Sequence, residues 1–241
     1  MKQNISRFCI SLVFIAVSFS TIAQEDKKTI ETSIEEIDTI KKKTIYHTLR
    51  FGIDVSKPLI TILNDNFSGA EIVADFRLKK NIYLATEIGY ADKTGEEDYI
   101  RYNSKGSYFK IGANYNLYQN WLDMKSEVYL GLRYGFSSFS QTLIEYTPNY
   151  KGTYFEIPTV TPNTEFDGLS AHWGEFVLGL RVEVLNNIFL GASMSMKKMF
   201  SKKEPDNFTN LYIPGYERVF SNDLGIGFNY TITYAIPLNK N

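Results

Sequence analysis

The chain has 241 residues with 26 basic and 27 acidic side chains, which gives a net charge of −1. It lacks the basic excess that nucleic-acid binding requires, so we expect no nucleic acid among its partners. A mean hydropathy of −0.22 argues against a bundle of membrane helices. It does not argue against membrane strands, in which only alternate residues meet lipid.

Residues 1–23 have the pattern of a secretory signal peptide. Lys2 and Arg7 form a positive end, residues 8–19 an apolar core, and Thr21-Ile22-Ala23 a small-residue cleavage site. The apolar run is shorter than the roughly 20 residues of a membrane helix, although an uncleaved anchor is the alternative. The only cysteine, Cys9, lies in this segment, so the mature chain has no thiol for disulfides or catalysis.

Residues 24–47 are rich in charge around four isoleucines, namely Ile30, Ile34, Ile37 and Ile40. We interpret this stretch as a solvated periplasmic tether, because the apolar stripe is thin and β-branched. The alternative is a short helix that docks on a periplasmic partner or on the mouth of the following domain.

From Thr48 to Pro237, eight segments alternate between apolar and polar or small residues. In the first segment, residues 49–56, Phe51 and Ile53 point one way and Gly52 and Asp54 the other, because successive strand side chains project to opposite faces. The other segments span 70–78, 82–90, 109–117, 127–136, 175–184, 188–197 and 224–235. We therefore predict an all-β fold over residues 48–238, an eight-stranded antiparallel up-and-down transmembrane β-barrel.

The apolar face could point inward, as in a soluble lipocalin-type barrel, or outward toward lipid. The lumen of an eight-stranded barrel holds only a limited set of side chains, and the large apolar residues of one face would overfill it. The other face has nine glycines, which suit a crowded lumen: Gly52, Gly89, Gly112, Gly131, Gly135, Gly179, Gly191, Gly225 and Gly227. The pattern favours an apolar face toward lipid.

Every charged residue of these segments falls on the polar face, six basic and seven acidic. We predict that they form a salt-bridge network in the lumen, because buried charges persist only when paired. A pore that selects one ion sign would show an excess of the opposite sign, so an ion channel is disfavoured. The predicted network comprises Arg50, Asp54, Glu71, Asp75, Arg77, Glu87, Lys110, Glu127, Arg133, Glu175, Arg181, Glu183 and Lys197.

The connections alternate in length. Those over residues 79–81, 118–125 and 186–187 are short, whereas 57–69, 91–107, 138–174 and 199–223 are long. Bacterial outer-membrane barrels have short periplasmic turns and long outer loops. The pattern therefore predicts that the long connections lie outside the cell and both termini in the periplasm.

Residues 48–238 resemble the small eight-stranded outer-membrane barrels of the OmpA and OmpX type. The resemblance implies a monomer in the bacterial outer membrane that contacts membrane lipid and lipopolysaccharide and is inserted by the barrel-assembly machinery. It implies no cofactor. The chain also looks like barrel families of similar length whose function is uncharacterised. It departs from the pattern at its end, Tyr234 to Asn241, which lacks the terminal aromatic residue common in such barrels.

A catalytic site has only weak candidates. His172, with Ser170 and Glu175 nearby, could form a hydrolytic set at the outer start of the sixth segment, but the spacing matches no established motif. We therefore assign no catalytic residue. We predict no metal site, and the acidic run Gly95–Asp98 is better explained as a solvated loop tip than as a loose calcium site.

The longest connection, residues 138–174, is rich in aromatic residues. Exposed aromatics suit surface binding, and the candidates are Tyr146, Tyr150, Tyr154, Phe155 and Trp173. The alternative is that the fifth and sixth strands extend beyond the membrane and pair there. We expect a non-enzymatic barrel with a side-chain-filled lumen, acting in envelope structure, surface binding or adhesion. A barrel enzyme that modifies outer-membrane lipid and a narrow channel are the alternatives.

Overall fold

The computed structural model describes residues 48–117, 126–148, 158–206 and 208–238. The predicted signal peptide and the predicted tether lie outside these ranges. The candidate loop aromatics Tyr150, Tyr154 and Phe155 also lie outside them.

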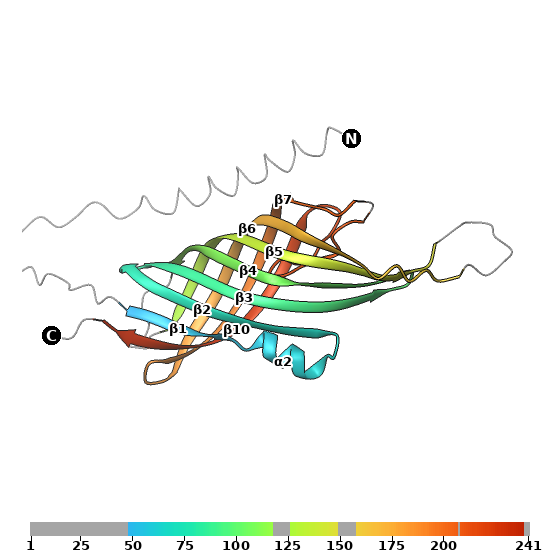
Figure 1. Ribbon diagram of the computed structural model, residues 1–241. Coiled ribbons are helices and arrows are strands. Elements are labelled where there is room, and N and C mark those ends of the chain that lie inside the picture. The colour runs from blue at the N-terminus through green and yellow to red at the C-terminus, as the bar shows by residue number, and fades with distance from the viewer. Residues whose placement is uncertain (1–47, 118–125, 149–157, 207, 239–241) are drawn as a thin grey trace, which may run out of the picture. The chain divides into compact units, whose positions relative to one another are not determined.

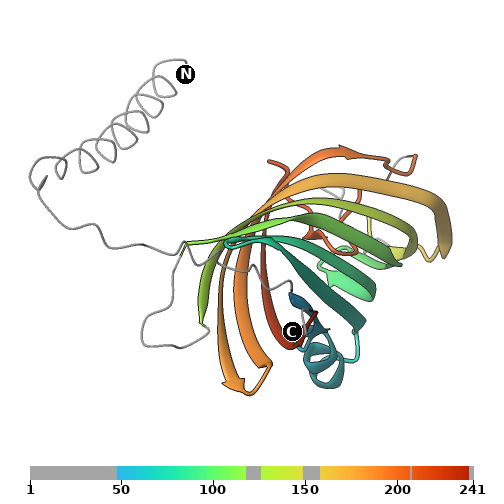
Figure 2. The ribbon, with the colours of Figure 1, turned by 90° about the vertical axis from the view of Figure 1, so that its left-hand side faces the viewer.

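Eight long strands form a closed antiparallel ring in which β10 pairs with β1 (Figures 1 and 2). The other neighbours in the ring are consecutive along the chain, apart from two short strands inserted between β7 and β10. The prediction of an eight-stranded up-and-down barrel is thus confirmed. The ring consists of β1 (Thr48–Asp54), β2 (Phe67–Lys79), β3 (Ile82–Glu97), β4 (Ile100–Asn116), β5 (Glu127–Tyr146), β6 (Thr164–Leu185), β7 (Ile188–Lys202) and β10 (Leu224–Pro237).

The two faces of the wall differ as the alternation predicts. Outward side chains are apolar and exposed, such as Leu132 at 67% and Ile226 at 58%, whereas the inward Arg50 is 3% exposed. An apolar belt around a closed ring suits a lipid bilayer, because the ring leaves no unpaired strand edge in the hydrocarbon. In the described residues no helix is long and apolar enough to cross a membrane.

Four strands run well past the predicted membrane segments. β3 and β4 pair as far as Glu97 and Ile100, and β5 continues to Tyr146 beside β6. The predicted outer loop 91–107 is therefore almost entirely strand. The described part of 138–174 is also mostly strand, as the alternative interpretation of that connection expected. In Figure 1 this extension lies at the end of the barrel opposite the carboxyl terminus.

The connection from 57 to 69, predicted as a loop, contains a helix. β1 was expected to reach Ser56 but ends at Asp54, whose Oδ1 accepts hydrogen bonds from the Ser56 backbone N–H and hydroxyl at 2.8 and 2.6 Å. Helix α2 (Ser56–Leu63) follows, with Pro58 in its first turn, where a missing N–H costs nothing. Its exposed side chains include Leu59, at 56%.

The connection from 199 to 223 does not extend outward as a loop. β7 continues to Lys202, and the chain then forms a hairpin of β8 (Tyr212–Ile213) and β9 (Glu217–Arg218). Ile213 and Tyr216 of this hairpin have no exposed surface. They pack in a buried cluster with wall residues such as Phe139. We call residues 208–219 the plug, because they fill the outer half of the lumen.

Large aromatic rings lie across inward-facing glycines of neighbouring strands. Tyr108 pairs with Gly89 in register, and Trp173 pairs with Gly135. A Cβ atom at either glycine would overlap the ring opposite. Trp173 was predicted as an exposed loop aromatic; that prediction is wrong, because it belongs to β6 on the same inward face as Glu175 and is fully buried.

The pairing of Gly135 with Trp173 gives a test of the fold. Gly135→Val should lower the fraction of folded barrel, because the added side chain would displace a ring that has no free space. Overpacking a core costs about 1–3 kcal/mol. Heat-modifiable migration in detergent gels measures the folded fraction. The control is Ala192→Val on the outward face of β7, which should migrate like wild type; equal effects of both substitutions would contradict the face assignment.

Candidate functional site

Near the end of the lumen where β1 begins, four charges form a closed group. Arg50 contacts Asp75 at 2.6 Å and Glu127 at 2.9 Å. Arg181 contacts the same two carboxylates, at 3.0 and 3.3 Å. Tyr83 donates its hydroxyl hydrogen to Glu127 at 2.8 Å. Two positive and two negative charges thus neutralise each other in a buried layer.

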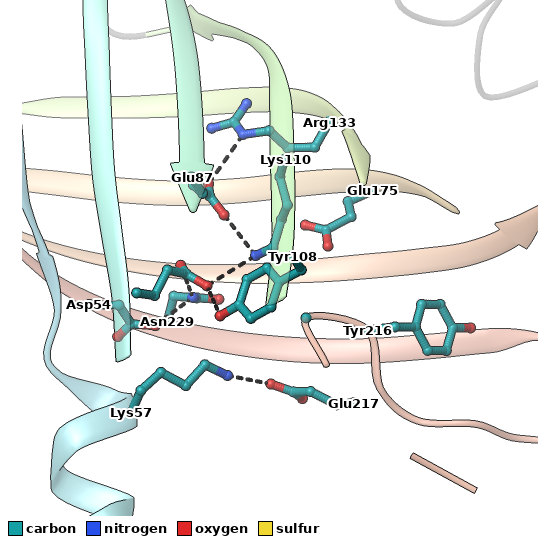
Figure 3. A network of polar contacts seen from close by, with 12 residues as sticks. Asp54, Lys57, Glu87, Tyr108, Lys110, Arg133, Glu175, Tyr216, Glu217 and Asn229 are labelled. Carbon is teal, nitrogen blue, oxygen red and sulfur yellow. Dashed lines mark hydrogen bonds and ion pairs between the residues drawn. The ribbon is translucent and has the colours of Figure 1, made fainter. Parts of the chain in front are cut away.

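A second group lies next to the first, toward the plug. Lys110 contacts Glu87 at 2.7 Å and Glu71 at 3.4 Å, and Arg133 contacts Glu87 at 3.2 Å (Figure 3). Tyr108 donates to Glu71 at 2.5 Å. This group also contains two positive and two negative charges. The near balance of charge seen in the sequence is therefore realised as two separate neutral groups.

The five other predicted lumen charges lie outside these groups. Asp54 accepts a hydrogen bond from Asn229 at 2.6 Å, and Glu175 accepts one from the Trp173 indole N–H at 2.7 Å. Lys197 donates to two backbone carbonyls of the plug. The remaining two lie near strand ends: Arg77 donates to the Lys80 carbonyl, and Glu183 accepts from the Asn187 backbone N–H.

The two charge groups leave little free space between them. A cavity lined by Glu71, Glu87, Arg133 and Arg181 measures about 30 Å³. That volume is sufficient for about one water molecule. A hydrated ion or solute does not fit, so this layer closes the lumen.

An ion pair that the sequence did not reveal holds the plug. Lys57, at the start of α2, contacts Glu217 of β9 at 2.7 Å, and its side chain is buried (Figure 3). Burial would lower the pKa of Lys57, but the carboxylates of Glu217 and Glu71 together outweigh it and raise this pKa. Burial would raise the pKa of Glu217, but the ammonium groups of Lys197 and Lys57 lower it to about 2.

Asn229 is a second residue that the sequence pattern did not single out. Its side-chain amide donates to Asp54 at 2.6 Å and to Glu71 at 3.1 Å, which links β10 to β1 and β2 from inside the lumen. Above it, the Tyr216 ring of the plug meets Trp173 edge-on, with centroids 5.8 Å apart. The charged layer and the aromatic plug therefore form one continuous filling.

The weak catalytic candidates do not form a site. His172 and Ser170 lie on the outward face of β6, and His172 Nδ1 hydrogen-bonds the Tyr134 hydroxyl at 2.7 Å. Glu175 points into the lumen on the opposite face. No general base, nucleophile and orienting carboxylate meet here. Within the described ranges, no cluster of three His, Cys, Asp or Glu residues is arranged to hold a metal ion.

A family model described as "Domain of unknown function (DUF6048)" matches residues 5–241, so the chain belongs to this family. No curated protein sequence matches it. Among solved structures, Neisserial surface protein A has a TM-score of 0.40 and 10% identity, covering 80% of this chain and 96% of that chain. The attachment invasion locus protein Ail of Yersinia pestis has a TM-score of 0.39 and 9% identity, covering 79% and 99%. A major outer membrane protein of Thermus thermophilus has a TM-score of 0.39 and 14% identity, covering 79% and 98%.

The ion pair between Lys57 and Glu217 should make the plug sensitive to acid. Because the pKa of Glu217 falls to about 2 from its usual 4.5, its stabilisation is complete above about pH 4.5 and is lost as the pH falls toward 2. In a Trp121→Phe background, Trp173 is the only tryptophan and its emission reports on the plug. We expect a red shift in this pH window.

The control for the acid response is Glu217→Gln in the same background. This variant cannot titrate at position 217, so its emission should change less between pH 4.5 and 2 than that of the parent. An identical acid response in both proteins would show that Glu217 does not hold the plug.

Proposed function

We propose that this member of the DUF6048 family is a non-enzymatic barrel of the bacterial outer membrane that does not conduct and that functions by binding at the cell surface. The observation that carries the proposal is the closed lumen. Two neutral charge groups and the plug occupy it, so the described chain offers solutes no path through the barrel. This argues against the narrow channel.

The binding surface in this proposal is the extension of β3 to β6 beyond the barrel. Ion pairs on its outer face link its strands: Arg101 of β4 contacts Glu145 of β5 at 4.0 Å, and Lys105 of β4 contacts Glu165 of β6, beyond β5, at 3.0 Å. Exposed pairs of this kind contribute little stability. Continuous strand pairing is what orders the extension, and an ordered surface loses less entropy when it binds.

Exposed aromatic side chains occupy the end of the extension. Tyr99 is 54% exposed, and Tyr146, one of the predicted loop aromatics, is 37% exposed. Aromatic groups supply contact area at low entropic cost, which suits recognition of a surface partner. Lipopolysaccharide and the assembly machinery stay predictions as partners. His172 and Glu175 lie on opposite faces of β6, so they do not form a hydrolytic set. This favours surface binding over a lipid-modifying enzyme.

Two measurements test the proposal. Reconstituted in planar bilayers, the protein should give no porin-sized conductance, with a known porin as the positive control; steady conductance would contradict a closed barrel. Lipid A from cells with and without the protein should have the same acylation in mass spectra. A changed pattern that disappears in His172→Ala would show an enzyme instead.

Surface binding is tested separately by trimming the extension. Cells of a deletion strain that express the full chain should attach to a protein-coated surface more than cells expressing a chain with residues 147–160 replaced by a short turn. Both chains should show heat-modifiable migration. Equal attachment would contradict binding through the extension.

A further inference from the structure

The barrel wall is incomplete on one side, because β1 is short. β1 pairs with β10 only from Thr231 to Pro237 and with β2 only from Ile72 to Phe76. The last backbone bond on this side joins the Val55 N–H to the Tyr230 carbonyl at 2.7 Å. In the described chain, residues 224–229 of β10 therefore have no paired strand on the side of β1. Residues 67–71 of β2 also have no paired strand on the side of β1.

Helix α2 lies beside this gap but is held mainly to one side of it (Figure 1). The Thr61 hydroxyl accepts a hydrogen bond from the Gly69 backbone N–H at 3.0 Å, and the Asn64 carbonyl accepts one from Phe67 at 3.0 Å. These bonds attach the helix and its following turn to β2. Among the described residues no hydrogen bond joins α2 to β10, so the β10 side is the open side.

A cavity of about 780 Å³ lies at the gap beside β10, and residues of both α2 and β10 line it. Its lining includes Lys197 and Gly225, which point into the lumen, and Met196 and Ile226, which belong to the lipid-facing side of the wall. Tyr212 and Glu217 of the plug line the same cavity, and the short β1 leaves the wall open between β10 and β2 at this position. The cavity therefore connects the outer part of the lumen laterally with the lipid-facing surface.

The cavity has an excess of positive charge. Four basic side chains line it, namely Lys57, Lys93, Lys197 and Arg218, against a single carboxylate, that of Glu217. In the described part of the chain, neither Lys93 nor Lys197 has a carboxylate within ion-pair distance. The ammonium of Lys93 lies 4.9 Å from the centre of the Tyr212 ring. Lys197 is 3% exposed and has only two backbone carbonyls for its three donors.

Buried cations require a compensating anion, because desolvation penalises an unpaired charge. Glu217 pairs with Lys57, and the exposed Arg218 contacts Glu97 at 3.2 Å, but within the described residues Lys93 and Lys197 have no carboxylate partner. The cavity therefore lacks negative charge beside these two lysines. Its lipid-facing part is apolar, with Ile60, Phe220, Leu224 and Ile226 among the lining residues. An occupant that suits both parts has an anionic head and an apolar chain.

We propose that this lateral cavity binds an anionic lipid of the surrounding leaflet. The phosphate-bearing headgroup lies among Lys93, Lys197 and Arg218, and an acyl chain lies against Ile226 and Met196 on the outside of the wall. The gap left by the short β1 is the route by which the lipid enters without leaving the membrane. This site is separate from the surface extension and does not depend on its function.

Lipid retention in nanodiscs tests the proposal with the full chain. The nanodiscs contain equal parts of phosphatidylglycerol and phosphatidylethanolamine, and native mass spectrometry counts the lipids that stay on the protein after release. We expect preferential retention of phosphatidylglycerol. In Lys93→Gln/Arg218→Gln this preference should fall about fivefold for each removed charge, as expected for basic groups near an anionic membrane surface.

The matched control is Arg101→Gln/Lys105→Gln, which removes the same charge from the extension on β4. It should retain phosphatidylglycerol like wild type, and all variants should keep heat-modifiable migration as evidence of folding. Equal retention of the two lipids by wild type, or an equal loss in both double variants, would overturn the proposal.

A separate arm distinguishes a lipid from a free anion. Ile226→Asn alters only the apolar part of the lining and should lower phosphatidylglycerol retention, because the acyl chain loses its contact. Added inorganic phosphate should displace little lipid. Complete displacement by phosphate, together with unchanged retention in Ile226→Asn, would show a site for a soluble anion and contradict lipid binding.

Discussion

The small volume enclosed by eight strands is the constraint on which the rest of this structure depends. A lumen of that width accepts side chains but no bulk water, so each inward polar group needs a partner within the protein. Arg50 and Arg181 share Asp75 and Glu127, and Lys110 and Arg133 share Glu87. Where aromatic rings occupy the same space, the residue across the strand pair is glycine, as with Trp173 and Gly135. Removing one partner of such a buried ion pair costs about 3–5 kcal/mol, because the other charge is left buried and unpaired.

The same constraint explains the end of the lumen opposite the termini. The wall strands there enclose an aromatic cluster that the plug completes with Ile213 and Tyr216. The ion pair of Lys57 with Glu217 joins α2 to the plug, so the segment that ends β1 early also holds the plug in place. A short β1 therefore has two consequences. It supplies the lysine that fixes the plug, and it opens the wall beside β10, where basic side chains meet lipid-facing apolar ones.

Much of this could be predicted from the sequence, because strand periodicity assigns each residue to a face. The alternation identified the eight strands and separated Arg50 from Phe51 correctly. The alternation also predicts that Trp173 faces inward, because Trp173 lies two residues before the inward Glu175. The composition of the connection had suggested an exposed loop instead. It could not reveal the contact of Lys57 with Glu217, which are 160 residues apart and belong to no shared pattern. It also placed Ser56 in a strand, because a polar residue continued the alternation where Pro58 instead allows a helix to begin.

The central claim, a closed lumen inside a lipid-facing wall, is tested most directly by NMR of methyl-labelled protein in lipid nanodiscs. Val177 and Leu178 are adjacent in β6, but Val177 is 6% exposed and points inward, whereas Leu178 is 50% exposed and points outward. The structure predicts that Leu178 methyls show cross-relaxation with lipid chains and that Val177 methyls show it with neither lipid nor water. Strong cross-relaxation between Val177 and water would mean a hydrated lumen and would contradict the account.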